Sequence, residues 1–339
     1  MTTLVTGATG FVGSHVARQL VSAAQSVRVL VRPHSNLEAL AGLHVEYFEG
    51  DLRDQESLER AMHGIRRVFH VAADYRLWTP RPEEIYEINV EGTRKLLAAA
   101  QRARVERIVY TSTVATIAVP RNGVLPNEAT QASLDEMIGH YKRSKFLAEQ
   151  VAVEAVSAGL PVVIVNPTAP VGPWDWKPTP TGKIILDFLN GKMPGYVETG
   201  LNFVGVEECA AGHLLAAEHG KMGERYLLGA ENLTLKGLLD LLAQITGLRA
   251  PGMKIPHGVA LGVAYLDTAF SRLMGKEPQI PVEGVKIAQH KMFVDASRAQ
   301  RELGFHPGPV AAALERAVRW YRANGYVTAR RAKRIKLAA

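Results

Sequence analysis

The sequence predicts an α/β protein with a doubly wound parallel sheet, followed by a smaller and mostly helical C-terminal lobe. Over the first 170 residues, short apolar runs alternate with longer segments of helical periodicity. That alternation is typical of βα units around a parallel sheet. After Asn166 the chain changes to NPTAPVGPWDWKPTPTG, which is too irregular for another βα unit and too apolar for a disordered linker. We therefore expect this segment to face a substrate.

The apolar runs predict seven strands: Thr2–Thr6, Val27–Arg32, Val45–Phe48, Arg67–Val71, Arg107–Thr111, Pro161–Asn166 and Arg225–Leu228. A helix is expected from Pro82 to Arg102, because proline and two glutamates open it and apolar or small residues follow at helical spacing. We expect an N-terminal domain at 1–166, to which parts of 201–229 return. The substrate lobe is expected at 167–200 and 230–326, and a basic tail at 327–339.

Composition indicates an ordinary globular protein, with 47% hydrophobic and 22% charged residues among 339. The formal net charge is +7, and five of the positive charges stand in the tail at Arg330, Arg331, Lys333, Arg334 and Lys336. The rest of the chain is close to neutral, which argues against a nucleic-acid partner. Because Cys209 is the single cysteine, an internal disulfide is excluded, and we expect neither a thiolate cluster nor a metal site.

No stretch of eighteen apolar residues without charge occurs, and the chain opens on a strand-like run, MTTLVTG, instead of a signal segment. We therefore expect a cytosolic protein.

Three glycines, Gly7, Gly10 and Gly13, stand in TGATGFVG between the first expected strand and a helix. In this position glycine permits a tight turn, close approach of a pyrophosphate and close packing of helix on strand. The helix N-terminus adds unpaired N–H groups that favour phosphate. The motif predicts a Rossmann dinucleotide site, and we expect Thr9, Phe11 and Val12 to contact the cofactor together with the glycines.

Arg32 stands nineteen residues beyond Gly13, at the end of the second expected strand. A carboxylate there normally accepts hydrogen bonds from the ribose hydroxyls of NAD. A guanidinium instead suits a 2′-phosphate, to which it donates a charge-assisted fork. The sequence therefore favours NADP(H), with NAD(H) as the alternative if Arg32 is only an exposed strand-end residue.

Two further strand ends are expected to hold the cofactor. Asp51 and Leu52 follow the third strand and offer an acceptor and an apolar wall for adenine, although Asp51 is equally suited to cap a helix. Ala72 and Ala73 follow the fourth strand and are small enough for the cofactor to cross the sheet edge. His70, just before them, is interpreted as a core histidine.

Tyr141 and Lys145 occur four residues apart in HYKRSKFLAE, a segment of helical periodicity. This spacing places a phenol and an ammonium on one helix face. The ammonium is expected to lower the pKa of the phenol, so that Tyr141 can move a proton while a hydride moves to or from nicotinamide. Thr113 ends the preceding strand in YTST, where its hydroxyl can hold the substrate oxygen.

In this order, TGATGFVG, GDL, NVEGT, YTST, YKRSK and NPTAPVGP resemble the extended short-chain dehydrogenase/reductase family, over nearly the whole chain. That family includes sugar-nucleotide epimerases, dehydratases and dihydroflavonol reductases. The resemblance implies that Thr113, Tyr141 and Lys145 are catalytic and that Lys145 also binds the cofactor ribose. It implies that Asn89 orders the active-site backbone. Pro167 and Tyr141 are expected to contact the cofactor.

The segment KPTPTGKIILDFLNGKMPGYVETGLNFV is similar to the hopanoid-associated sugar epimerase group of that family, which implies a sugar or polyol substrate and a role in hopanoid metabolism. Gly205, Glu207 and Glu208 depart from the histidine and aspartates expected there. Substrate contact by those side chains is therefore open.

Asn166, Thr168 and Trp174 are the expected substrate-binding residues. Trp174 and Trp176 flank Asp175 in a loop, an arrangement suited to ring stacking and also to packing. Asn166 either bonds substrate or caps a strand turn. In the tail, Ile335 and Leu337 among basic residues allow weak attachment to a membrane surface, at the inner face of the membrane, although a solvated tail is favoured.

The sequence thus predicts hydride transfer at a secondary alcohol or carbonyl of a small molecule. A sugar epimerase and an NADPH-dependent ketone or aldehyde reductase share this machinery, and a non-catalytic NADP-binding sensor is the rival from another class. We expect a homodimer through the helices at 82–102 and 139–157.

Overall fold

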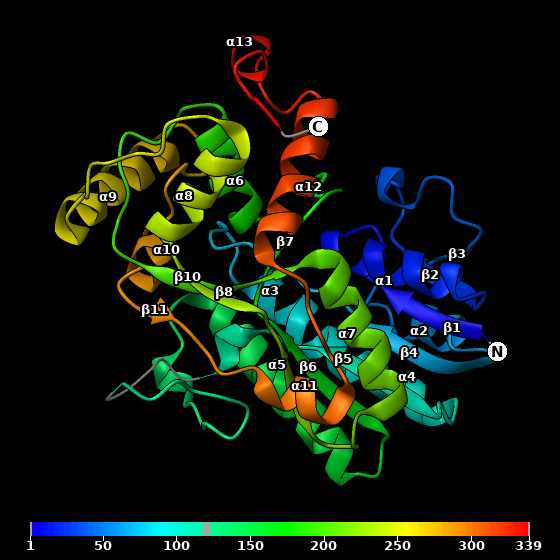
Figure 1. The fold of residues 1–339 in the computed structure, drawn as a ribbon. Helices are drawn as coiled ribbons and strands as arrows, with labels where there is room; N and C mark the ends of the chain where they lie inside the picture. Colours follow the sequence, from blue (N-terminus) through cyan, green and yellow to red (C-terminus); the bar gives the residue numbers. More distant parts are fainter. Residues whose placement is uncertain (1, 118–122, 338–339) are drawn as a thin grey trace.

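A seven-stranded parallel sheet forms the centre of the computed structural model, which describes residues 2–117 and 123–337 (Figure 1). In sheet order the strands are β3 (Glu46–Glu49), β2 (Ser26–Val31), β1 (Thr2–Thr6), β4 (Ile65–His70), β5 (Arg107–Thr111), β6 (Val162–Pro167) and β9 (Arg225–Leu228). All seven predicted strands are present, each within two residues of its expected bounds. The order leaves β1 in the interior and reverses direction between β1 and β4, so the predicted doubly wound fold is confirmed.

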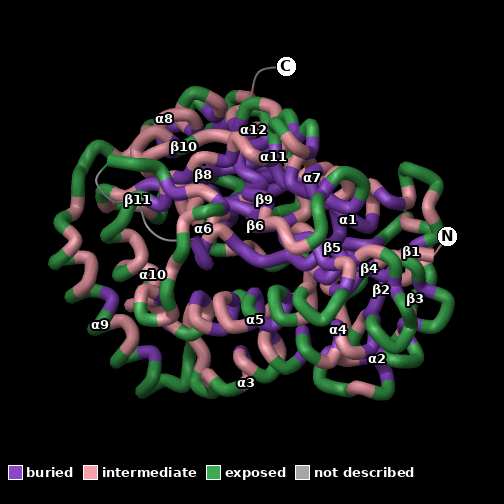
Figure 2. The backbone as a smooth tube through the Cα atoms, turned by 90° about the horizontal axis from the view of Figure 1, so that it is seen from below, coloured by how far each residue is buried: buried purple, intermediate pink, exposed green. Residues whose placement is uncertain are grey.

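Helices cover both faces of this sheet, and Figure 2 shows the buried residues concentrated between the two layers. One layer contains α1 (Phe11–Ser22), α7 (Val206–His219) and α11 (Ser297–Leu303). The other contains α2 (Gln55–Ala61), α4 (Gly92–Arg102) and α5 (Gly139–Ser157). Successive residues of a strand pack against opposite helix layers. In β1, Leu4 packs against the second layer and Val5 against the first.

The helix expected at Pro82–Arg102 consists of three consecutive helical parts. These are α3 (Glu83–Tyr86), a π-helical turn (Glu87–Glu91) and α4. Single π-helical turns inside α-helices occur frequently at functional sites. This turn contains Asn89, which the sequence singles out.

The C-terminal lobe is built on a second sheet that the sequence did not predict. Its strands are β7 (Ala169–Val171), β8 (Gly200–Gly205), β10 (Glu231–Thr234) and β11 (Lys291–Met292), with α6 (Pro180–Leu189), α8 (Leu235–Thr246) and α12 (Val310–Ala323) packed around them. Helices α9 (His257–Leu273) and α10 (Val282–Ile287) lie at the edge of this lobe (Figure 1). Two of its strands are only two and three residues long, too short to show alternation.

The basic tail folds back onto the C-terminal lobe as far as the structure describes it. After α13 (Ala329–Ala332), Ile335 is only 5% exposed and Leu337 packs against the same apolar cluster. The backbone N–H of Lys336 donates to the carbonyl oxygen of Thr246 at 2.8 Å. Up to residue 337 the tail is therefore packed on the lobe and not freely solvated, because Ile335 is buried and Leu337 is partly buried there, while its weak attachment to a membrane surface stays a prediction. No described helix is long and apolar enough to cross a membrane.

Candidate active site

The glycine turn after β1 is packed so tightly that side chains are excluded. Gly7 has φ +70°, and a Cβ there would lie 2.6 Å from the backbone nitrogen of Ala72 in the loop after β4. A Cβ on Gly13 would overlap the carbonyl oxygen of Gly7. Both glycines are thus required by close backbone contact at the carboxyl edge of the sheet.

The N-terminus of α1 begins in this turn and remains open. Gly10, at the N-cap, is exposed and supplies no side-chain hydrogen bond to the first helical turn. Thr9, Phe11 and Val12 are partly exposed beside it. Uncapped N–H groups at a helix N-terminus favour a phosphate, so these residues fit the diphosphate of a dinucleotide. Ala72 and Ala73, also partly exposed, leave the neighbouring strand end without bulk.

Charged residues meet beyond this turn at the end of β2. Arg32 is exposed and follows β2 directly. Asp51 accepts hydrogen bonds from Arg53 at 2.8 to 3.0 Å, which lower its pKa, and Arg32 lowers that pKa further. Asp51 is therefore engaged with Arg53 and does not cap α2, whose N-cap is Asp54. Leu52 is buried against Gly92.

Thr113 and Tyr141 meet at the carboxyl end of β5. Thr113 follows β5 and is 9% exposed, whereas Tyr141, in the first turn of α5, is half-buried. Burial raises the pKa of Tyr141, and a hydrogen bond with the Thr113 side chain lowers it in part. Two hydroxyls from separate elements thus lie near one another at this edge.

Lys145 lies one turn further along α5, buried to 3% exposure. Its Nζ donates to the carbonyl oxygen of Thr111 at 2.8 Å and to the hydroxyl of Tyr110 at 3.2 Å. Burial lowers the pKa of Lys145 to about 8, although Glu149 opposes this shift. Without a cofactor the pKa of Tyr141 is raised and not lowered, because burial of the phenol is the largest influence on it; the lowering expected beside an oxidised nicotinamide stays a prediction.

Asn89 ties three parts of the site together. Its Oδ1 accepts from the backbone N–H of Asp74 at 2.7 Å, and its Nδ2 donates to the carbonyl oxygen of Asp74 and to Ser144 Oγ, both at 2.9 Å. Ser144 in turn donates to the carbonyl oxygen of Tyr141 at 2.9 Å. The amide therefore links the loop after β4 to the first turn of α5, as expected of a residue that orders the backbone.

A buried polar network below the hydroxyl pair was missed from the sequence. Glu149 is 2% exposed and accepts from Thr116 Oγ1 at 2.9 Å, from Asn166 Nδ2 at 2.8 Å and from Arg225 at 3.1 Å. Asn166 Nδ2 also donates to the carbonyl oxygen of Thr113 at 3.1 Å. The available signal was spacing, since Glu149 follows Lys145 by four residues on the same helix.

Two predicted substrate residues lie inside the protein. Asn166 is fully buried and Thr168 is 7% exposed, with its hydroxyl donating to the carbonyl oxygen of Leu228 at 3.2 Å. Both side chains donate hydrogen bonds to protein groups, whereas Asn166 Oδ1 has no partner among the described residues, so their role as substrate contacts stays a prediction. Pro167, the last residue of β6, is buried at the same sheet edge as Thr113.

Trp174 is partly exposed and packs on α1. The guanidinium of Arg18 lies 3.1 Å from its ring centroid, and the ring of His15 lies 6.1 Å away. The backbone of Trp174 has φ +71°, a left-handed conformation that side chains rarely adopt. Cation–π and ring contacts within the protein thus hold Trp174, which supports the packing alternative, and its contact with a substrate stays a prediction.

The residues after Trp174 and the two glutamates at the start of α7 also contact protein groups. Asp175 is 1% exposed and accepts from the hydroxyl of Tyr321 at 2.8 Å, and burial raises its pKa to about 6. The ring of Trp176 lies 5.0 Å from that of Trp320. The carboxylates of Glu207 and Glu208 pair with Arg316 at 2.6 and 3.1 Å.

His70 and Cys209 are core residues. His70 is hydrogen-bonded to Thr6 at 2.8 Å and to Thr93 at 3.0 Å, and burial lowers its pKa to about 3. Cys209 is fully buried, which raises the pKa of its thiol. Within the described residues, no group of three or more histidine, cysteine or acidic side chains is placed to hold a metal ion.

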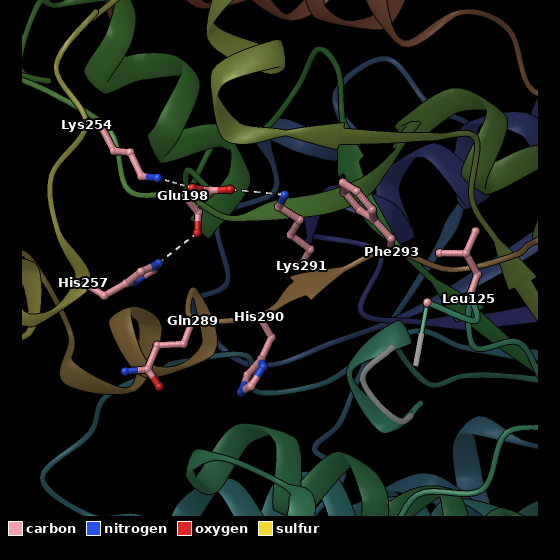
Figure 3. A pocket seen from close by; sticks show the side chains of 9 residues that line it. Leu125, Glu198, Lys254, His257, Gln289, His290, Lys291 and Phe293 are labelled. Atoms are coloured by element: carbon pink, nitrogen blue, oxygen red, sulfur yellow. Dashed lines mark hydrogen bonds and ion pairs between the residues drawn. The ribbon is translucent and has the colours of Figure 1, made fainter. Parts of the chain in front are cut away.

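A cavity of about 610 Å³ opens beside β11 (Figure 3). Glu198 is central in it, pairing with Lys254 and, at 3.4 Å, with Lys291, while its carbonyl oxygen is 2.9 Å from His257 Nε2. None of the predicted site residues lines it. Met292 follows Lys291 of this cavity. Its sulfur lies 4.0 Å from the Nζ of Lys142, the residue after Tyr141.

The chain matches known proteins along most of its length. The model of the NAD dependent epimerase/dehydratase family matches residues 3–229. A putative dihydroflavonol 4-reductase of Synechocystis sp. is 46% identical over 95% of both chains, and sterol demethylase protein B of Methylococcus capsulatus is 37% identical over 96% of this chain and 100% of its own.

A solved structure agrees with these matches. The crystal structure of a nucleoside-diphosphate-sugar epimerase from Pseudomonas aeruginosa superposes with a TM-score of 0.81 at 31% identity, covering 97% of this chain and 99% of that one. These matches agree with the structure, which has the glycine turn at the sheet edge and the doubly wound topology of a Rossmann fold. The chain is therefore an enzyme of the extended short-chain dehydrogenase/reductase family, within the NAD-dependent epimerase/dehydratase group.

Proposed function

We propose that this enzyme transfers hydride between NADP(H) and a secondary alcohol or ketone, with Thr113, Tyr141 and Lys145 as catalytic residues. The observation that carries the proposal is the position of Thr113, directly after β5, beside Tyr141 in the first turn of α5, close enough for its hydroxyl to act on the pKa of Tyr141. The glycine turn, which suits a dinucleotide, lies at the same edge. A doubly wound sheet binds ligands at this edge, beside the point where strand order reverses.

The bound nicotinamide cofactor supplies the hydride acceptor or donor. Thr113 and Tyr141 both hydrogen-bond the substrate oxygen, and Tyr141 gives its phenolic proton to that oxygen during reduction or takes it during oxidation. Lys145 would hold a ribose hydroxyl of the bound cofactor and, as an ammonium within the same buried region, would stabilise the phenolate that remains. Asn89 and Asn166 act as positioning residues, because their amides hold the backbone at Tyr141 and Thr113.

NADP(H) is proposed as the preferred cofactor because Arg32 is an exposed cation at the end of β2. Its guanidinium can donate two charge-assisted hydrogen bonds to a 2′-phosphate. The first turn of α1 holds the diphosphate, and Leu52, Ala72, Ala73 and Pro167 provide the apolar walls. Asp51, being paired with Arg53, contributes its remaining acceptor capacity at the adenine end.

Ketone reduction is the favoured direction. Burial raises the pKa of Tyr141, so the phenol remains protonated and suited to donate its proton. Relatives with reductase-type names support this direction. The second candidate is a sugar or polyol epimerase of hopanoid metabolism, favoured by the segment around 177–204 and by the similar epimerase structure.

The test is turnover of a panel of ketones, alcohols and sugars with NADP(H), compared between wild type and Tyr141→Phe. We expect the variant to lose about 100-fold or more in kcat/KM while cofactor binding is retained. Tyr47→Phe is the matched control, since Tyr47 is 46% exposed on β3. Equal activity of wild type and Tyr141→Phe would remove Tyr141 from the mechanism. Cofactor binding without turnover of any substrate would instead favour a sensor.

A further inference from the structure

Helix α9 concentrates the exposed apolar side chains of the molecule. Sixteen large apolar residues are exposed in the described chain, and nine of them fall between residues 253 and 280. On and beside α9 these are Met253, Val259, Val263, Tyr265, Leu266, Phe270, Leu273, Met274 and Ile280, and the exposure of Leu266 and Leu273 reaches 74% and 83%. An apolar patch of this density on a soluble fold marks an interaction surface.

The exposed face of α9 is uncharged along most of its length. Between His257 and Ser271 the only charged side chain of the helix is Asp267, whose carboxylate accepts from the backbone N–H of Ile280 at 2.7 Å. Only Ala264 and Ser271 are buried in this helix. At 100° per residue, the exposed apolar positions cover about half of the helix circumference. The face is thus broad, apolar and directed to solvent.

The width of this face distinguishes between two kinds of partner. A single partner helix covers the narrow seam formed by two positions per heptad, here Val259, Val263, Leu266, Phe270 and Leu273, and would leave Tyr265 at its side in water. A lipid surface, by contrast, covers the whole exposed half of the helix. The exposed cations Arg272 and Lys276 stand at the C-terminal end of α9, followed by the exposed acid Glu277, so that this end carries a net charge of +1. This charge complements anionic headgroups.

We propose that α9 lies in the plane of an anionic lipid surface, with its apolar face inserted at the level of the headgroups and with Arg272 and Lys276 paired to lipid phosphates. The helix has seventeen residues, long enough to lie along a surface and too polar on its inner side to cross a bilayer. The cavity beside β11 adjoins this surface, because Lys254 and His257, at the start of α9, line it.

An environment-sensitive fluorophore at Phe270→Cys tests insertion directly. The native Cys209 is fully buried, so a thiol-reactive probe labels the introduced cysteine selectively. With vesicles of equal phosphatidylcholine and phosphatidylglycerol we expect a blue shift and a several-fold rise in emission. A probe at Met222→Cys, a 63% exposed position outside α9, should show neither change. Identical spectra with and without vesicles at position 270 would overturn the proposal.

Co-sedimentation with the same vesicles gives the energetic test. We expect Leu266→Ser combined with Leu273→Ser to weaken binding at least tenfold, with cofactor affinity unchanged as evidence of folding, whereas Met222→Ser has no effect. Arg272→Ser combined with Lys276→Ser should reduce binding to anionic vesicles several-fold. Equal sedimentation of wild type and the double leucine variant would overturn the assignment. A dimer in light scattering that the leucine variant converts to monomer would also overturn it, since the face would then be covered by a second copy.

Discussion

The side chains at the candidate active site are held by contacts from distant parts of the chain. Asn166, at the end of β6, donates to the carbonyl oxygen of Thr113 and to the carboxylate of Glu149 on α5. Arg225, at the start of β9, completes the pairing of that carboxylate at 3.1 Å. A buried carboxylate needs such partners, because an unpaired charge in the interior is costly. The position of Thr113 therefore depends on three elements besides its own.

At this scale we propose that Arg32 sets the preference between NADP and NAD. We expect Arg32→Asp to shift the ratio of dissociation constants for NADP and NAD at least tenfold toward NAD, because a carboxylate repels the 2′-phosphate and accepts from ribose hydroxyls. Fluorescence titration with both cofactors measures this ratio. Arg60→Asp, at an exposed position on α2, controls for the change in net charge. A ratio that stays at its wild-type value would exclude Arg32 from the cofactor site.

At the scale of elements, short segments with weak local patterns complete the C-terminal lobe. The short strands β7 and β11 both pair with β8, and this pairing is what stabilises them as strands. The segment after α13 has a basic sequence, yet its apolar residues join the cluster formed by α6, α8 and α12. In each case tertiary contacts outweigh local composition.

Ile335 tests the packing of this last segment. We expect Ile335→Asp to lower the free energy of unfolding by about 3 kcal/mol, because it removes a buried side chain and introduces an unpaired carboxylate. Urea denaturation followed by circular dichroism measures the loss. Lys333→Asp, in the same segment but exposed, should change stability by less than about 0.5 kcal/mol. Equal stability of the two variants would show that the segment is not packed in solution.

Buried histidines make the stability of the whole molecule depend on pH, and a buried carboxyl group opposes their effect only in part. Burial lowers the pKa of His15 and His213 to about 4 and that of His70 to about 3, from 6.5. These imidazoles remain neutral in the folded protein at a pH where the unfolded chain binds protons. Stability is therefore complete above pH 6.5 and is lost as pH falls toward the folded pKa values. Asp175 opposes this trend, because its pKa is raised to about 6.

We expect the free energy of unfolding to fall by roughly 4 kcal/mol between pH 7 and pH 5, at about 1.4 kcal/mol per pH unit for each histidine, less the opposing carboxyl. Urea titrations across this range measure the slope. In His70→Gln about a third of the histidine contribution should disappear. A free energy that stays constant from pH 7 to pH 5 would contradict the burial of these imidazoles.

The sequence by itself determined the large sheet, the glycine turn and the spacing of Tyr141 and Lys145, because strand periodicity, backbone demands and helix geometry act over a few residues. The family followed from the same local motifs. Only the tertiary structure decided which polar groups face a ligand and which face protein. Asn166, Thr168 and Trp174 have the chemistry of substrate contacts, yet Asn166 bonds Glu149 of α5, Thr168 bonds Leu228 of β9 and Trp174 packs on Arg18 of α1.

The same reason explains the surfaces. Local pattern assigns apolar residues to the core, and in α9 it is the absence of a covering element that leaves Leu266 and Phe270 in solvent. The tail shows the opposite case, since Ile335 stands among cations and is nevertheless buried. Burial depends on which segments meet in three dimensions, and that is set by contacts between residues far apart along the chain.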